Sequence, residues 1–105
     1  MSVPVDVADL DRVLAGFGAG YLLTVSAASS VKAVSVAPAS VDGDLLVSGP
    51  GRGSIANSGA NPAVTLLFPP RVAGDLSLLV DGTATVDGDD VRIRPTGAVL
   101  HKSVS

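Results

Sequence analysis

Hydrophobic residues change their spacing once along the chain, and the change separates a short helix from a series of strands. Near the N-terminus, Val7, Leu10, Leu14 and Phe17 follow one another at three, four and three residues, which places all four on one helical face. Asp6 precedes them in the position of an N-cap, and the glycines at 16, 18 and 20 end the pattern. From residue 21 onward the hydrophobic period is two, as in half-buried strands.

Segments with this two-residue period are predicted to be strands, and turn residues separate them. Asp42-Gly43 and Asp87-Gly88 are typical of hairpin turns in which the central residues take positive φ. Asp81-Gly82 carries the same pair inside a strand pattern and indicates a β-bulge. The predicted strands are residues 21–25, 31–41, 44–48, 63–68, 76–86 and 91–95, with a short helix over 54–60 after the third. These antiparallel connections point to a mainly β, six-stranded antiparallel barrel.

The second predicted strand has two unlike faces. Val34, Val36 and Pro38 lie on one face, whereas the other consists only of alanine and serine at positions 33, 35, 37 and 39. Such small side chains let another group approach the sheet closely. Packing against a neighbouring sheet is the simpler interpretation, and a flat ligand is the alternative.

Composition restricts the class of protein. The 105 residues suffice for one domain, which we expect to span 1–105. The chain has no cysteine, which excludes disulfides and thiolate metal sites and favours a reducing, cytoplasmic location. Its single histidine excludes a multi-histidine zinc site within one chain, so no metal is predicted.

Charge and hydropathy restrict the partners. The net charge is −3 and the basic residues are scattered singly, which argues against nucleic-acid binding. Residues 13–31 carry no charge, but glycines and serines interrupt them and only 21–25 is densely apolar, so no membrane span is predicted. With 47% hydrophobic and 16% charged residues, and a mean hydropathy of +0.50, we expect part of the apolar surface to be covered by a second copy in a homodimer.

The glycine-rich turn at residues 48–57 is the most informative segment for function. A strand enters it and the predicted helix leaves it, an arrangement in which free N–H groups attract anions. Arg52 adds a planar fork of donors, and Ser54 adds a hydroxyl. The segment lacks the Gly-Lys-Ser/Thr of a P-loop, and too few residues follow it for the crossover helix of a Rossmann unit. A phosphate cradle and a plain glycine-rich turn with a surface arginine both remain open.

The order of these motifs resembles one known family. A strand of small residues, then Ser48-Gly-Pro-Gly-Arg-Gly-Ser, a short helix with Asn57, Asn61-Pro-Ala-Val-Thr-Leu, and the ending Pro95-Thr-Gly-Ala-Val-Leu-His101 are similar to short actinobacterial members of the pyridoxamine 5′-phosphate oxidase-like family. The resemblance implies a six-stranded split barrel that forms a homodimer with FMN at the interface. Some relatives bind the deazaflavin F420 or haem instead.

The resemblance also implies roles for individual residues. On the phosphate side of the cofactor it places Ser48, Arg52, Ser54 and Asn57. Beside the isoalloxazine ring it places Ser35, Val36 and Ala37. His101 is similar to a C-terminal family residue that reaches toward the partner subunit's site. Ile55 and Ala56 occupy the first turn of the helix where relatives often carry a cation, and Lys32 is the only other nearby cation.

Three functional hypotheses follow. The first is an FMN- or F420-dependent oxidoreductase acting on a small molecule, because a flavin carries the hydride and the protein mainly positions it. The second is a non-catalytic binder of flavin, deazaflavin or haem. The third is a split-barrel dimer without cofactor that serves a protein interaction. A catalytic triad of His101 with Ser54 or Ser103 is not predicted, because the sequence around neither serine resembles a nucleophile elbow.

Overall fold

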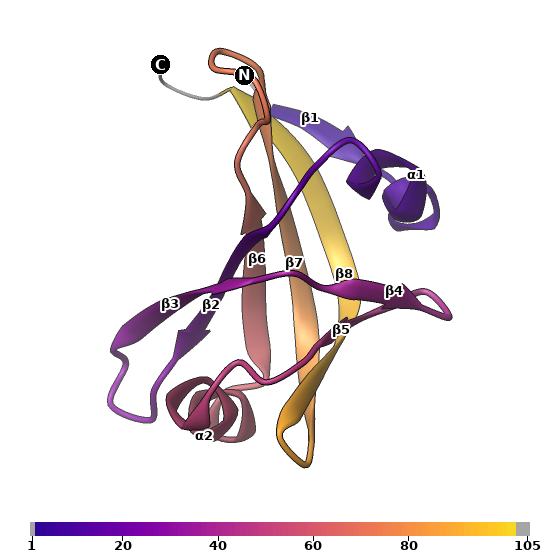
Figure 1. The fold of residues 1–105 in the computed structure, drawn as a ribbon. Helices are drawn as coiled ribbons and strands as arrows, with labels where there is room; N and C mark the ends of the chain where they lie inside the picture. The colour runs from indigo at the N-terminus through magenta and orange to yellow at the C-terminus, as the bar shows by residue number, and fades with distance from the viewer. Residues whose placement is uncertain (1, 103–105) are drawn as a thin grey trace.

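One antiparallel sheet runs through residues 2–102, the part of the chain that the computed structural model describes (Figure 1). Its strands are β1 (Ser2–Val5), β2 (Gly20–Val25), β3 (Val31–Val36), β4 (Ala39–Val41), β5 (Asp44–Val47), β6 (Ala63–Phe68), β7 (Leu76–Asp87) and β8 (Asp90–Lys102). The helical elements are η1 (Val7–Asp9), α1 (Leu10–Leu14) and α2 (Arg52–Ala60). The predicted mainly β class, with an N-terminal helix and a short helix after the Asp44 strand, is confirmed.

The sheet follows the order β3-β2-β6-β7-β8-β5-β4 and curls into a barrel. The long strand β8 pairs with β7 along one side, while its other side pairs first with β5 and then with β1. β3 and β4 are the two ends of this order and are joined directly along the chain. The barrel is therefore split: the covalent connection from β3 to β4, and not a continuous ladder, spans the gap between its edges.

This split corrects the prediction of one strand over 31–41. β3 pairs with β2, whereas β4 pairs with β5, so the two segments belong to opposite edges of the sheet. Pro38 lies in the break between them, and proline has no N–H to donate to a ladder. In Figure 1 the two segments cross the front of the barrel as one extended ribbon. Together with β1, which the hydrophobic pattern did not indicate, the division raises the number of strands within residues 2–102 from the predicted six to eight.

The β7–β8 hairpin contains the predicted bulge. Asp81 pairs with Gly97 and Gly82 pairs with Pro95, so Thr96 has no partner in the register. The register shift next to Pro95 lets the strand continue past the proline. β8 therefore extends to Lys102 instead of ending at Pro95 as predicted. The Asp42-Gly43 turn is confirmed as well, with φ of 51° and 82° at its two residues.

The barrel interior is filled by alternate side chains of the strands. The fully buried ones include Leu22, Leu45, Leu66, Phe68, Leu78, Val80, Val91 and Ile93. The N-terminal helical segment closes one end of this core: Leu10 is buried, and the Phe17 ring lies 6.4 Å from that of Phe68. The predicted cap is present, since the Asp6 carboxylate accepts a hydrogen bond from the Ala8 N–H at 3.0 Å. No helix among residues 2–102 is long and apolar enough to cross a membrane.

Candidate functional site

The first turn of α2 presents three N–H groups that no other residue uses. The glycine-rich loop leaves β5 with Gly49 and Gly51 at φ of 58° and 98°, and Gly51 is the N-cap. The first hydrogen bond of the helix runs from the Ile55 N–H to the Gly51 carbonyl at 3.1 Å. Within residues 2–102 the N–H groups of residues 52–54 have no acceptor. Because Gly51 has no side chain, no cap occupies this positive end of the helix.

Lys32 of β3 adds a cation to this turn. A Cβ placed on Gly53 would lie 2.6 Å from Lys32 Nζ and 3.1 Å from its Cε, so the lysine side chain passes directly over the helix start. Arg52, the first residue of α2, is also exposed here. The turn therefore combines two cations and three free N–H groups. This donor set suits a phosphate, whose oxygens accept several hydrogen bonds at once.

Ser54 does not face this turn. Its side chain is fully buried, as is that of Ser58 one turn later, so both lie on the face of α2 that packs against the sheet. Neither hydroxyl has a hydrogen-bond partner among the described residues. Of the phosphate-side residues that the family resemblance implied, Ser54 thus offers its backbone N–H, and Ser48 remains exposed in the loop.

Asn57 and Asn61 fix α2 against the β2–β3 hairpin. The Asn57 side-chain amide donates to Thr24 Oγ1 at 3.1 Å, and Thr24 is fully buried. The Asn61 amide donates to the carbonyls of Val25 and Ser26 at 3.1 and 3.0 Å. Asn57 therefore has a structural contact besides its expected place beside a phosphate, and the two amides keep the helix start next to Lys32.

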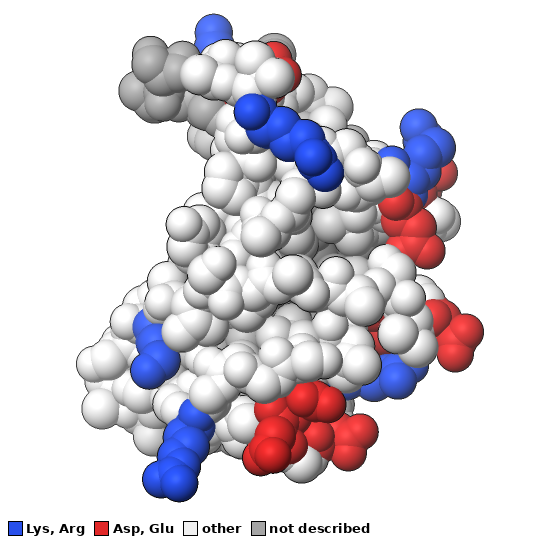
Figure 2. Space-filling model, in the orientation of Figure 1, with Lys and Arg blue, Asp and Glu red and all other residues white. Residues whose placement is uncertain are grey.

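The outer face of β3 is small and uncharged. Ser35 and Ala37 are exposed, whereas Val36 is only 8% exposed and points into the barrel. Of these residues, Ser35 and Ala37 can therefore offer side chains to a ligand outside the barrel, and Val36 can offer only its backbone. On the side of the molecule that β3 and β4 cross, the charged side chains lie around the edge and the centre has none (Figure 2).

His101 lies apart from the other expected site residues. It is exposed near the end of β8, and its Nδ1 lies 3.0 Å from Ser2 Oγ. The end of β8 is at the opposite end of the barrel from α2 (Figure 1). Within one chain the fold thus brings Lys32 and Arg52 together at the start of α2. Ser35 lies on the opposite face of β3 from Lys32, and His101 lies at the far end of the barrel (Figure 1).

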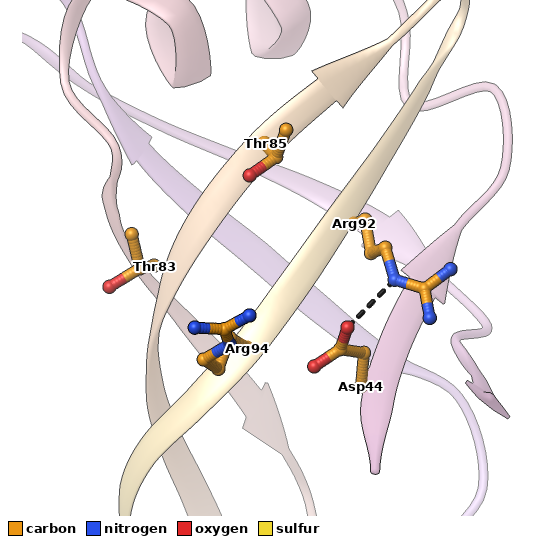
Figure 3. Close-up of a pocket in the computed structure, with 5 residues that line it drawn as sticks. All are labelled: Asp44, Thr83, Thr85, Arg92 and Arg94. Atoms are coloured by element: carbon orange, nitrogen blue, oxygen red, sulfur yellow. Dashed lines mark hydrogen bonds and ion pairs between the residues drawn. The ribbon is translucent and has the colours of Figure 1, made fainter. Parts of the chain in front are cut away.

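A polar pocket on the outer face of the β7–β8 hairpin was not predicted from the sequence. It has a volume of about 340 Å³ and is lined by Asp44, Thr83, Thr85, Arg92 and Arg94 (Figure 3). The alternation Thr83-x-Thr85 and Arg92-x-Arg94 on either side of the predicted hairpin could have revealed it, because hairpin register places these pairs opposite each other. No group of three or more potential metal ligands is found in residues 2–102.

Structural comparison identifies proteins with the same fold. No protein-family model matches the chain, and no curated protein matches it in sequence. Its structural neighbours include proteins described as a candidate pyridoxamine 5′-phosphate oxidase, FAD-binding proteins, a general stress protein and a haem storage protein. A candidate pyridoxamine 5′-phosphate oxidase from Listeria innocua has a TM-score of 0.74 at 16% identity, over 90% of this chain and 96% of its own.

Two further neighbours differ in what they bind. An FAD-binding protein from Mycobacterium smegmatis superposes with a TM-score of 0.72 at 14% identity, over 99% of this chain and 100% of its own. The haem storage protein HutZ from Vibrio cholerae has a TM-score of 0.65 at 14% identity, over 90% and 93% of the two chains. The predicted split-barrel fold is thereby confirmed, and its neighbours hold more than one kind of cofactor.

Proposed function

We propose that the protein binds a flavin, FMN in the first place, and acts as a flavin-dependent oxidoreductase on a small molecule. The observation that carries this proposal is that Lys32 lies over the unpaired N–H groups that begin α2, with Arg52 as the first residue of the same helix. FMN ends in a phosphate, and phosphate is the group that such a turn suits. Flavin-binding neighbours with the same fold support the choice of ligand.

The small outer face of β3 provides a place for the ring system. Ser35 follows Lys32 by three residues, which is about 10 Å along an extended strand. This odd spacing places the side chains of Lys32 and Ser35 on opposite faces of β3. A flavin whose phosphate lies at the start of α2 would therefore pass the free edge of this end strand to place its ring beside the small side chains of Ser35 and Ala37. When bound, a flavin supplies hydride transfer, and the residues of this chain would hold and orient it. F420 also carries a phosphate and is the second ligand to test.

The phosphate contribution can be isolated by comparing FMN with riboflavin, which lacks the phosphate. Each ligand is titrated into purified protein and followed by flavin fluorescence. Arg52→Ala and Lys32→Ala should each weaken FMN binding by about 1.5–3 kcal/mol, the range of a hydrogen bond to a charged group. Neither substitution should change the affinity for riboflavin. Arg12→Ala is the matched control, because Arg12 is an exposed arginine of α1 paired only with Asp9 at 3.7 Å.

The alternatives give different results in the same experiment. Equal losses for FMN and riboflavin would show that Arg52 and Lys32 do not contact a phosphate. Binding of haem with no binding of FMN or F420 would favour the non-catalytic haem binder. Failure of all three ligands would leave the cofactor-free dimer. Turnover of a bound flavin with a reduced nicotinamide donor and a small-molecule acceptor separates an enzyme from a carrier.

We also propose that the protein works as a homodimer in the cytoplasm. An apolar row crosses the outer face of the sheet, since Tyr21 pairs with Leu67, Leu67 with Leu79, and Leu79 with Val99. Tyr21 is 44% exposed, which is high for a tyrosine amid such neighbours. A second copy would cover this row, and would allow His101 to approach the cofactor of its partner.

Mass in solution, measured by light scattering after gel filtration, tests the dimer. The wild-type chain should have twice its monomer mass, and Leu79→Asp should halve it by placing a charge in the apolar row. Val72→Asp is the control, because Val72 is 62% exposed in the loop between β6 and β7. A monomeric wild-type protein would contradict the proposal.

A further inference from the structure

The outer face of the β7–β8 hairpin carries two polar cross-strand pairs. Thr83 is opposite Arg94 and Thr85 is opposite Arg92, so two hydroxyls and two guanidinium groups form adjacent rows. Asp44 of β5 closes one side of the pocket of about 340 Å³ that they line. In Figure 3, Arg92 is directed toward Asp44, and Arg94 lies between Thr83 and Asp44.

Arg92 is held in place by neighbouring strands. Its Nε donates to Asp44 Oδ2 at 2.7 Å, and its Nη2 donates to the Val41 carbonyl at 3.4 Å. The hydrogen bond to Asp44 raises the pKa of Arg92, burial opposes this rise, and the charges of Asp44, Asp42 and Asp87 add to it. Arg92 therefore stays charged, and its charge is balanced by these carboxylates.

Arg94 has no such partner. Among residues 2–102 no hydrogen bond or ion pair is found for its guanidinium, and Asp44, the one carboxylate lining the pocket, is engaged by Arg92. Arg94 thus places an unbalanced positive charge beside the hydroxyl of Thr83. A guanidinium offers two parallel N–H groups to a carboxylate or phosphate, and a threonine hydroxyl can donate to the same oxygens.

The floor of the pocket is rigid. Ile93, which separates the two arginines, and Val91, which precedes Arg92, are fully buried, and Ala84, which separates the two threonines, is 6% exposed. The polar side chains therefore project from a strand pair that is anchored in the core on its other face. The backbone of the site and the Arg92 side chain are therefore held in place before a ligand binds, which limits the entropy lost on binding to that of ordering the Arg94 side chain and the threonine hydroxyls.

We infer that this pocket binds a small molecule through a phosphate or carboxylate group, with Arg94 as the principal contact and the two threonines as additional donors. The pocket shares none of the residues proposed to hold the flavin. It is therefore a second, separate anion site, and its existence does not depend on the identity of any cofactor at α2.

Amide NMR shifts on labelled protein can test this inference residue by residue. Inorganic phosphate and succinate are titrated separately at constant ionic strength, with sodium chloride as the compensating salt, because exposed charges are screened by salt. We expect saturable shifts at residues 83–85 and 92–94. Arg94→Gln should weaken the anion binding measured there at least tenfold, which corresponds to about 1.4 kcal/mol. Arg12→Gln, an exposed arginine of α1, should leave it unchanged.

Each outcome bears on the inference. Tighter binding of phosphate would identify a phosphate ester as the ligand class, and tighter binding of succinate would identify a carboxylic acid. Shifts confined to residues 51–54, or equal affinity in the wild type and Arg94→Gln, would overturn the inference. If Arg94→Gln does not fold, Arg94→Lys keeps the charge but loses the planar fork, and unchanged affinity in that variant would overturn it equally.

Discussion

Gly82 is the position where one added methyl group should disturb the barrel most clearly. It lies at the β7–β8 bulge, and its backbone is buried. A Cβ at this position would lie 2.5 Å from Ile93 Cγ2 and 2.7 Å from the Arg94 carbonyl oxygen. Both distances are shorter than van der Waals contact allows, so Gly82→Ala requires the two strands to move apart.

The size of the effect follows from which atoms must move. The Arg94 oxygen belongs to the backbone of β8, and Ile93 is fully buried in the core, so neither contact can be relieved by rotating a free side chain. Overpacking of this kind costs about 1–3 kcal/mol. Alanine restricts the unfolded chain and returns about 0.5–1 kcal/mol. We therefore expect a net loss of up to about 2.5 kcal/mol, with a central value of about 1 kcal/mol, and each kcal/mol lowers Tm by about 4–8 °C for a domain of this size.

Urea unfolding and thermal scans at one fixed protein concentration measure this loss, since association would make Tm depend on concentration. Gly97→Ala is the matched control: it lies at the same bulge, on the facing strand, and no atom lies within 4 Å of its added Cβ. Gly59→Ala, in the last turn of α2 with open space around it, should stabilise the protein slightly. A Gly82→Ala variant as stable as the Gly97→Ala variant would refute this account of the bulge.

Three further predictions concern other parts of the fold. Asn57→Ala removes the partner of the buried Thr24 hydroxyl and should lower the free energy of unfolding by about 1–3 kcal/mol in urea titrations, and an unchanged value would mean that Thr24 finds another acceptor or donor. Gly43→Ala places a side chain at φ of +82° and should destabilise the β4–β5 hairpin by about 1 kcal/mol, whereas a gain in Tm would contradict the assigned turn. The hydrogen bond to Asp44 raises the pKa of Arg92, so the stabilisation from Arg92 is complete below the pKa of an unfolded arginine and is lost only as pH rises through the higher folded value. The contribution of Arg92, taken as the Tm difference between wild type and Arg92→Gln, should therefore not fall between about pH 6 and pH 10 as a result of Arg92 deprotonation, and a titration of the Arg92 guanidinium seen by NMR in that window would contradict this.

Local chemistry explains which parts of the fold the sequence predicted. The Asp42-Gly43 turn and the Asp81-Gly82 bulge depend on residues adjacent in the chain, and both were found where the sequence placed them. The same holds for β2 and β6, whose two-residue period reflects one buried and one exposed face. β1 was not predicted because it has no buried residue, so its sequence lacks the alternation of a half-buried strand. It joins the sheet by pairing with β8.

The candidate sites likewise have features that follow from neighbouring residues and features that depend on contacts between distant segments. The sequence placed Arg52 at the start of a helix after a glycine-rich loop, and this required only neighbouring residues. It could not show that Lys32 passes over Gly53, that Ser54 turns into the barrel, or that Arg94 is left unpaired while Asp44 binds Arg92.

The sequence by itself predicted strands such as β2 and β6, the Asp42-Gly43 turn and a helix that begins at an anion-binding turn, because periodicity and turn chemistry act over a few residues. Only the tertiary structure decided which strand edges meet, where the barrel splits at Pro38, and which charges share a pocket. These depend on pairing between segments tens of residues apart, where register, burial and the direction of each side chain are settled together.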